Sequence, residues 1–166
     1  MLGKDARRGA PRLGPRVIVR KVCGGGAVFK RILVPIDLSG RNTRTIGVAL
    51  ELALGTHALV TLCHVIQSVR DVPSAELRKF YRRLEATSAG TLARVAKRFR
   101  ARGVPVDTVV CIGEPAREVV RLASARRIDL IVMGSHKVRA GRWSTGWGTI
   151  SYKVGIFCRC PVLLVK

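Results

Sequence analysis

The sequence predicts an α/β fold whose centre is a doubly wound, five-stranded parallel sheet. From residue 29 onward, short β-rich runs alternate with longer segments in which apolar residues recur at helical spacing. Two of the short runs, 30–37 and 128–134, are almost continuously apolar, which is typical of strands buried on both faces. Buried strands that are separated by helices imply parallel pairing with right-handed crossovers.

The first two predicted strands, KRILVPID (30–37) and HALVTLCHVI (57–66), enclose a predicted helix over 41–54. The apolar residues of this helix recur at the spacing of one helical face: Ile46, Ala49, Leu50 and Ala53. A strand, a helix and a second strand therefore form the first repeating unit.

A long basic amphipathic helix is predicted from Ser74 to about Arg102, and Gly103 fits its C-terminal cap. We expect its inward face to consist of Leu77, Phe80, Tyr81, Leu84, Leu92, Val95, Ala96 and Phe99.

The rest of the chain repeats the alternation of strand and helix. The predicted elements are a strand at 104–112, a helix at 114–127 with Pro115 in its first turn, a strand at 128–134, a helix at about 149–158 and a strand at 160–166.

The chain of 166 residues fits one domain. Residues 1–27 contain several Gly and Pro and predict a flexible basic arm, which leaves 28–166 as the folded domain. No apolar run approaches the roughly 18 residues that a membrane span needs. The N-terminus lacks the apolar segment of a secretory signal, so we expect a cytoplasmic protein.

The formal net charge is +21, which favours anionic partners such as nucleotides, nucleic acid or lipid head groups. Residues 1–31 hold nine basic side chains against Asp5 alone. The arm is therefore a candidate for electrostatic binding of nucleic acid, and a simple solvated tail is the alternative.

Five cysteines are present, and most of them lie in apolar segments, which predicts buried free thiols. Cys158 and Cys160 form a C-x-C pair. This pair lacks the spacing and the second ligand pair of a zinc site, so we predict no metal site from the protein's own side chains.

Three stretches are expected to meet at the carboxyl edge of the sheet, where open α/β sheets bind ligands. They are Pro35-Ile36-Asp37 after the first strand, His64-Val65-Ile66 at the end of the second, and Met133-Gly134 at the end of the fourth.

Four segments carry a resemblance to a known family: RILVPIDLS, VTLCHVI, GEPAREVVRLASARRIDLIVMGSH and CRCPVLLVK. In this order and spacing they cover about residues 29–166, and the chain resembles a universal stress protein. The resemblance implies a Rossmann-like fold of the adenine nucleotide alpha hydrolase type. It also implies a regulatory protein of the stress response that binds ATP with Mg²⁺, or another adenine nucleotide. It also implies a homodimer that forms through the terminal strand, 161–165.

The ATP-binding branch of this family carries G-x2-G-x9-G-(S/T) after its fourth strand. Here Gly134 matches the first glycine and Gly148-Thr149 the final pair, whereas Lys137 stands at the second glycine and ten residues separate it from Gly148. Lys137 either binds a phosphate or fills the site and excludes the nucleotide.

The glycine pattern is also suited to phosphate binding on physical grounds alone. Glycine lets the backbone approach phosphate oxygens and adopt positive φ, and the N–H groups of Gly148, Thr149 and Ile150 would begin a helix whose N-terminus favours anions. Nearby cations would add charge-assisted bonds to a triphosphate, and the candidates are Lys137, Arg139 and Arg142.

The resemblance also assigns the remaining site residues. Asp37 is expected to contact the sugar and the phosphate–metal region of the nucleotide, and its alternative role is the N-terminal cap of a helix that starts near Arg41. Apolar residues would line an adenine slot, with ordinary core packing as the alternative for Val65 and Met133. The full predicted nucleotide site is Pro35, Ile36, Asp37, Val65, Met133, Gly134, Lys137, Gly148, Thr149 and Ile150.

The sequence does not identify an enzyme. His64 and His136 lie at strand ends, but no Ser or Cys nucleophile with a matching acid partner can be assigned by spacing. The S-G-G-x-D-S loop of ATP pyrophosphatases is also missing after the first strand. Slow ATP hydrolysis stays open, and so does the role of Trp143 and Trp147, which would either stack on a partner or cover the fold's own apolar edge.

Two other function classes remain as alternatives. One is a stress protein that does not bind nucleotide and acts through protein contacts, which Lys137 favours. The other is nucleic-acid association through the basic arm and the basic side of the long helix, formed by Arg78, Lys79, Arg82, Arg83, Arg94, Lys97 and Arg98.

Overall fold

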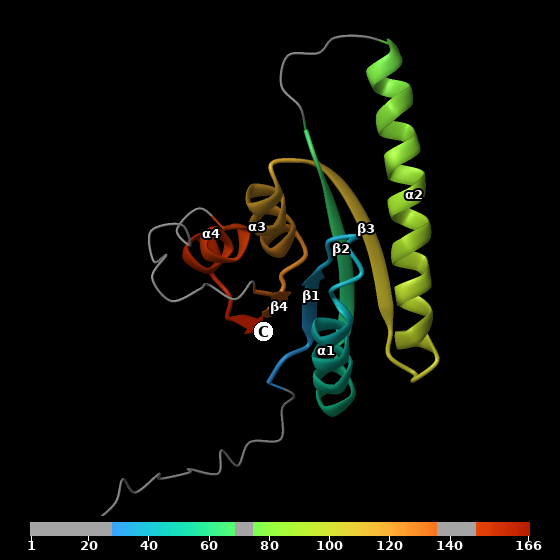
Figure 1. Cartoon of the computed structure of the whole chain (residues 1–166). Coiled ribbons are helices and arrows are strands. Elements are labelled where there is room, and N and C mark those ends of the chain that lie inside the picture. Colours follow the sequence, from blue (N-terminus) through green and yellow to red (C-terminus); the bar gives the residue numbers. More distant parts are fainter. Residues whose placement is uncertain (1–27, 69–74, 136–148) are drawn as a thin grey trace, which may run out of the picture.

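A computed structural model describes residues 28–68, 75–135 and 149–166 (Figure 1). The expected basic arm, 1–27, lies outside these ranges. Strands and helices alternate along the described chain in this order: β1 (Arg31–Pro35), α1 (Thr43–Thr56), β2 (Leu59–Gln67), α2 (Ala75–Arg100), β3 (Val106–Gly113), α3 (Pro115–Ala125), β4 (Leu130–Gly134), α4 (Ile150–Phe157) and β5 (Val162–Val165).

The strands form one five-stranded sheet in the order β3-β2-β1-β4-β5, and every neighbouring pair is parallel. This confirms the predicted doubly wound α/β fold. The strand order reverses at β1, which pairs with β2 on one side and with β4 on the other. The carboxyl ends of these three strands therefore meet at the switch point of the sheet.

Helices cover both faces of the sheet, so the fold has three layers (Figure 1). On one face, α1 and α2 pack over Ile32 and Val34 of β1. On the other face, α3 and α4 pack over Leu33. Successive residues of a strand point to opposite faces, and all three of these side chains are fully buried. This two-sided burial explains why the sequence of β1 is apolar without interruption.

Burial on both faces does not extend to the edge strands. In β5 the side chains of Leu163 and Leu164 are 39% and 43% exposed, and in β3 Ile112 is 39% exposed. Burial on both faces therefore holds for the central strands and not for β3 and β5, which form the two edges of the sheet.

Only the second half of α2 packs as predicted. Leu92, Ala96 and Phe99 are buried, and the N–H of Gly103, at φ +73°, caps the helix on the carbonyl of Arg100. Phe80 is 53% exposed, which contradicts its expected inward position. The N-terminal end of α2 extends past the sheet, so its apolar stripe has less core to contact there (Figure 1).

Some predicted strand boundaries shift because side chains bind the backbone at the amino edge of the sheet. The carboxylate of Asp129 accepts hydrogen bonds from the amides of Lys30 and Arg31, at 2.8 and 3.0 Å. Strand β4 accordingly begins at Leu130, two residues later than the predicted start. Across the described ranges, no helix combines the length and the apolar character that crossing a bilayer requires.

Candidate functional site

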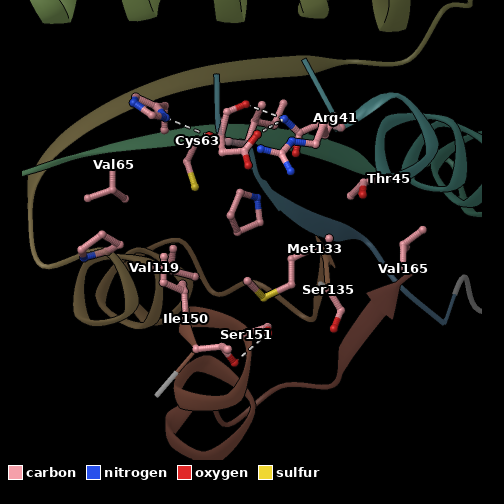
Figure 2. A pocket seen from close by; sticks show the side chains of 18 of the residues that line it. Arg41, Thr45, Cys63, Val65, Val119, Met133, Ser135, Ile150, Ser151 and Val165 are labelled. Atoms are coloured by element: carbon pink, nitrogen blue, oxygen red, sulfur yellow. Dashed lines mark hydrogen bonds between the residues drawn. The ribbon is translucent and has the colours of Figure 1, made fainter. Parts of the chain in front are cut away.

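A cavity of about 590 Å³ opens at the carboxyl ends of β1, β2 and β4, within the size range of small-molecule sites (Figure 2). Side chains from both helical layers reach it. Its walls are formed by Pro35, Ile36, Asp37, Arg41, Asn42, Arg44, Thr45, Cys63, His64, Val65, Pro115, Val119, Met133, Gly134, Ser135, Thr149, Ile150, Ser151, Val165 and Lys166.

The cavity brings together eight of the ten residues that the sequence assigns to a nucleotide site: Pro35, Ile36, Asp37, Val65, Met133, Gly134, Thr149 and Ile150. The other two, Lys137 and Gly148, lie outside the described residues. The same is true of His136, Arg139, Arg142, Trp143 and Trp147.

Asp37 is held by a turn that leads from β1 into α1. Its Oδ1 accepts hydrogen bonds from Ser39 Oγ at 2.6 Å, Ser39 N at 3.2 Å and Asn42 Nδ2 at 2.7 Å, and Asn42 also donates to the Asp37 carbonyl. The N-cap residue of α1 is Asn42, so the alternative role of Asp37 as the cap itself is wrong.

These hydrogen bonds set the charge of Asp37. Burial is the largest single influence on its pKa and acts to raise it, but the hydrogen bonds from Ser39 and Asn42 together outweigh burial and lower the pKa. The cavity therefore carries a fixed negative charge at neutral pH. Ligands with hydroxyl donors, or with a bound divalent cation, match this wall.

The floor of the cavity is apolar. Met133 and Cys63 are buried, and Val65 and Val119 line the cavity beside them (Figure 2). Burial raises the pKa of Cys63 to about 12, so its thiol is neutral. Met133 and Val65 also pack in the core cluster under α3. These two residues therefore both line the cavity and contribute to core packing.

His64 joins β2 to the end of β1. Its Nδ1 lies 2.8 Å from the carbonyl oxygen of Ile36, which can only accept, so Nδ1 carries the proton in this contact. The partner is a backbone carbonyl and not a carboxylate, so the contact does not build a charge-relay pair. His64 orients the strand ends and presents its ring to the cavity.

Gly134 ends β4 at the cavity wall. A Cβ at this position would meet Thr45 Oγ1 at 3.4 Å, an ordinary van der Waals contact, and Gly134 is not among the described glycines with positive φ. The expectation that a positive φ requires glycine is therefore wrong here. Among the described residues, the fold has room for a methyl group at Gly134.

Thr149 begins α4, and its side chain accepts a hydrogen bond from Tyr152 N at 3.3 Å. Thr149 Oγ1 also lies 3.3 Å from Ser151 Oγ, and Ile150 and Ser151 face the cavity (Figure 2). The first turn of α4 thus places hydroxyl groups and a helix N-terminus, which favours anions, on one wall.

The sequence interpretation missed three cations on the cavity wall: Arg41, Arg44 and Lys166. It sought cationic phosphate ligands only between residues 137 and 142. The available signal was the position of Arg41 and Arg44, which lie four and seven residues after Asp37, at the start of the helix that leads away from the carboxyl end of β1.

The chain is similar to proteins of one known family. A model of the universal stress protein family matches residues 29–166. Universal stress protein YxiE of Bacillus subtilis is 26% identical over 149 residues, which cover 84% of this chain and 100% of YxiE. A universal stress protein of Thermus aquaticus is 32% identical over 145 residues, again 84% of this chain and 100% of the relative.

Solved structures show the same architecture. The hypothetical protein MJ0577 superposes with a TM-score of 0.71 at 26% identity, over 84% of this chain and 96% of its own. A universal stress protein in complex with cAMP gives 0.63 at 21% identity, over 82% and 96%. One from Archaeoglobus fulgidus in complex with dAMP gives 0.60 at 21% identity, over 84% and 99%.

Proposed function

Because this chain belongs to the universal stress protein family, we propose that it is a regulatory protein that binds ATP in the cavity at the switch point of its sheet. Two proteins of the same fold were solved with adenine nucleotides, cAMP and dAMP. The observation that carries the proposal is the gathering of eight residues of the expected site around one cavity with an apolar floor, one carboxylate and several cations.

Each part of the nucleotide fits a different group of residues that line the cavity. The adenine ring, which is flat and largely apolar, fits against Val65 and Met133. The ribose hydroxyls fit the ionised carboxylate of Asp37, which accepts hydrogen bonds. The triphosphate then extends toward the first turn of α4 and the guanidinium groups of Arg41 and Arg44.

Asp37 is the residue that would hold a divalent cation accompanying ATP, and the cation would neutralise phosphate charge. Hard cations such as Mg²⁺ prefer carboxylate and phosphate oxygens and retain several waters. A single ionised carboxylate beside a phosphate site fits this preference. The chain's own residues then hold and orient the nucleotide, and we assign none of them a role in cleaving it.

The experiment that tests the proposal is release of bound nucleotide. Protein purified from high salt is denatured with acid, and the supernatant is assayed for ATP and other adenine nucleotides. Wild type is expected to release ATP in near-stoichiometric amount, or to bind added ATP with Mg²⁺, and Asp37→Ala is expected to lose it.

Failure of wild type to carry or bind ATP would overturn the proposal. Recovery of binding in Lys137→Gly would then show that one side chain closes the cavity. No binding in either form would support the alternative function, in which the protein acts through protein contacts.

We also propose a homodimer that forms through β5. The carbonyls of Pro161 and Val165 accept hydrogen bonds from the β4 side, from Ile131 N and Ser135 N. Backbone groups at alternate positions point the other way, so Val162 and Leu164 direct theirs outward. Leu163 and Leu164 are also partly exposed, and an apolar edge of this kind is suited to pairing with a second copy.

A further inference from the structure

The C-x-C pair lies at the turn between α4 and β5, away from the cavity. Cys158 caps α4 through its amide, which donates to the carbonyl of Val154 at 2.9 Å. Cys160 precedes Pro161 and the start of β5. The two Sγ atoms lie 3.4 Å apart, and both thiols are free and half-buried. The prediction of buried thiols is thus correct for Cys63 and wrong for this pair.

We propose that Cys158 and Cys160 are a redox modification site, at which exchange with a small-molecule disulfide forms a reversible intrachain disulfide. The sulfurs need to approach by only roughly 1.4 Å from their 3.4 Å separation to reach disulfide bond length. The residue between them, Arg159, is exposed and belongs to neither a helix nor a strand. The turn can therefore adjust without breaking a regular element.

The exchange proceeds in two steps. The thiolate of Cys158 attacks one sulfur of the small disulfide, which forms a mixed disulfide and releases the first small thiolate. The thiolate of Cys160 then attacks the Cys158 sulfur and releases the second. The two protein thiols lose two protons, which the two released thiolates take up, and two electrons pass from the cysteine sulfurs to the small disulfide.

The surroundings of the pair assign these roles. Burial raises the pKa of Cys160 to about 12, and the hydrogen bond with Cys158 adds to this effect. Cys160 is thus a poor first attacker at neutral pH, which suits it to the second step, inside the mixed disulfide.

The buried thiol Cys63 is a worse candidate. Cys63 is fully buried beneath the cavity, where a small disulfide cannot reach it. A metal site is also a weaker interpretation of the pair, because across residues 28–68, 75–135 and 149–166 no group of three or more His, Cys, Asp or Glu side chains is placed to hold one. Cys158 and Cys160 thus present a dithiol without further metal ligands.

The test uses the full chain, reduced, desalted and equilibrated with mixtures of oxidised and reduced glutathione. After acid quench and alkylation, intact mass and free thiols are measured. Trypsin cuts after Lys153 and Arg159, which separates the two cysteines into peptides 154–159 and 160–166. Only a disulfide keeps these peptides joined.

The expected product has lost two hydrogens and has three free thiols instead of the five in the sequence. Its two tryptic peptides are joined, and dithiothreitol separates them. The Cys111→Ser variant should behave in the same way, whereas Cys160→Ser should retain glutathione on Cys158. A disulfide that maps to another pair, glutathione adducts in wild type without the joined peptides, or no change in mass would overturn the proposal.

Discussion

The side-chain amide of Asn42 donates a 2.7 Å hydrogen bond to Oδ1 of Asp37, so the residue that caps α1 also orients the carboxylate at the cavity. Changing Asn42 to Ala removes this bond, and we expect the pKa of Asp37 to rise toward its ordinary value. The measurement is an NMR pH titration of the Asp37 carboxyl carbon in both proteins. An unchanged pKa would show that Ser39 and the charge of Arg41 lower it without Asn42.

Asp37 should also make stability depend on pH. Its pKa is lower in the folded protein than the ordinary value of 3.8, so the ionised carboxylate contributes stability above that value. The contribution is lost as the pH falls through the folded pKa. In chemical denaturation, wild type should therefore be more stable than Asp37→Asn at pH 7, and the two should converge in strong acid. A difference that grows on acidification would contradict the assignment.

Gly134→Ala should separate ligand binding from folding. Of the described residues, the added methyl group meets only Thr45 Oγ1, at 3.4 Å, so the melting temperature should stay close to that of wild type. Binding of ATP should weaken by about tenfold or more, equivalent to at least about 1.4 kcal/mol, because the methyl group stands where the ligand approaches. Calorimetry measures both quantities. Gly90→Ala, on α2, is the matched control and should leave binding unchanged.

Arg44→Ala should discriminate between nucleotides. A hydrogen bond to a charged group is worth about 1.5–3 kcal/mol, so ATP affinity should fall by roughly ten- to a hundredfold. Adenosine, which has no phosphate, should bind equally well to both proteins. Arg102→Ala is a suitable control, because Arg102 faces Glu51 at 4.0 Å and does not line the cavity. Equal losses for ATP and adenosine would mean that Arg44 does not contact phosphate.

Two phenylalanines of α2 should respond in opposite ways to truncation. Phe99 is fully buried, and Phe99→Ala should lower the free energy of unfolding by about 3–5 kcal/mol. Phe80 is 53% exposed, so Phe80→Ala should lower it by less than about 1 kcal/mol. Guanidinium denaturation of the two variants checks this. A large loss at Phe80 would indicate that a partner or a second copy covers it.

The proposed dimer depends on the outward backbone of β5. Leu164→Pro removes the outward N–H but leaves the groups that face β4, so this variant should be monomeric. Leu164→Ala retains the N–H and should still dimerise, with weaker affinity. Light scattering after gel filtration gives the mass of each protein. A dimeric Leu164→Pro protein would exclude pairing through this edge.

Sequence reasoning worked best where local pattern and burial coincide. The apolar run of β1 and the spacing of Leu92, Ala96 and Phe99 reflect direct contact with the core, so pattern alone located them. Phe80 has the same periodicity, but only the tertiary structure shows that the sheet ends before it. The spacing of apolar residues identifies the helix face that can be buried. The length of the sheet beside the helix then determines which of those residues are buried.

Part of the candidate site could likewise be predicted from the sequence, and part could not. The sequence could predict the cavity residues that lie on β1, β2 and β4, because parallel strands present their carboxyl ends at the same edge of the sheet. Arg44 was missed because it lies inside a helix, where the sequence shows only a solvated basic residue. The hydrogen bonds that lower the pKa of Asp37 come from a turn whose geometry no spacing rule supplies.

The strand order has a consequence for the protein during its synthesis. Of the described strands, β1 is synthesised first, although its final position is in the middle of the sheet. One of its two neighbours, β4, is synthesised much later, because it starts at Leu130. At about 5–20 residues per second, one side of β1 waits on the order of 5 to 20 seconds for its partner on the ribosome. An apolar strand with an open side can pair with another nascent chain during this interval.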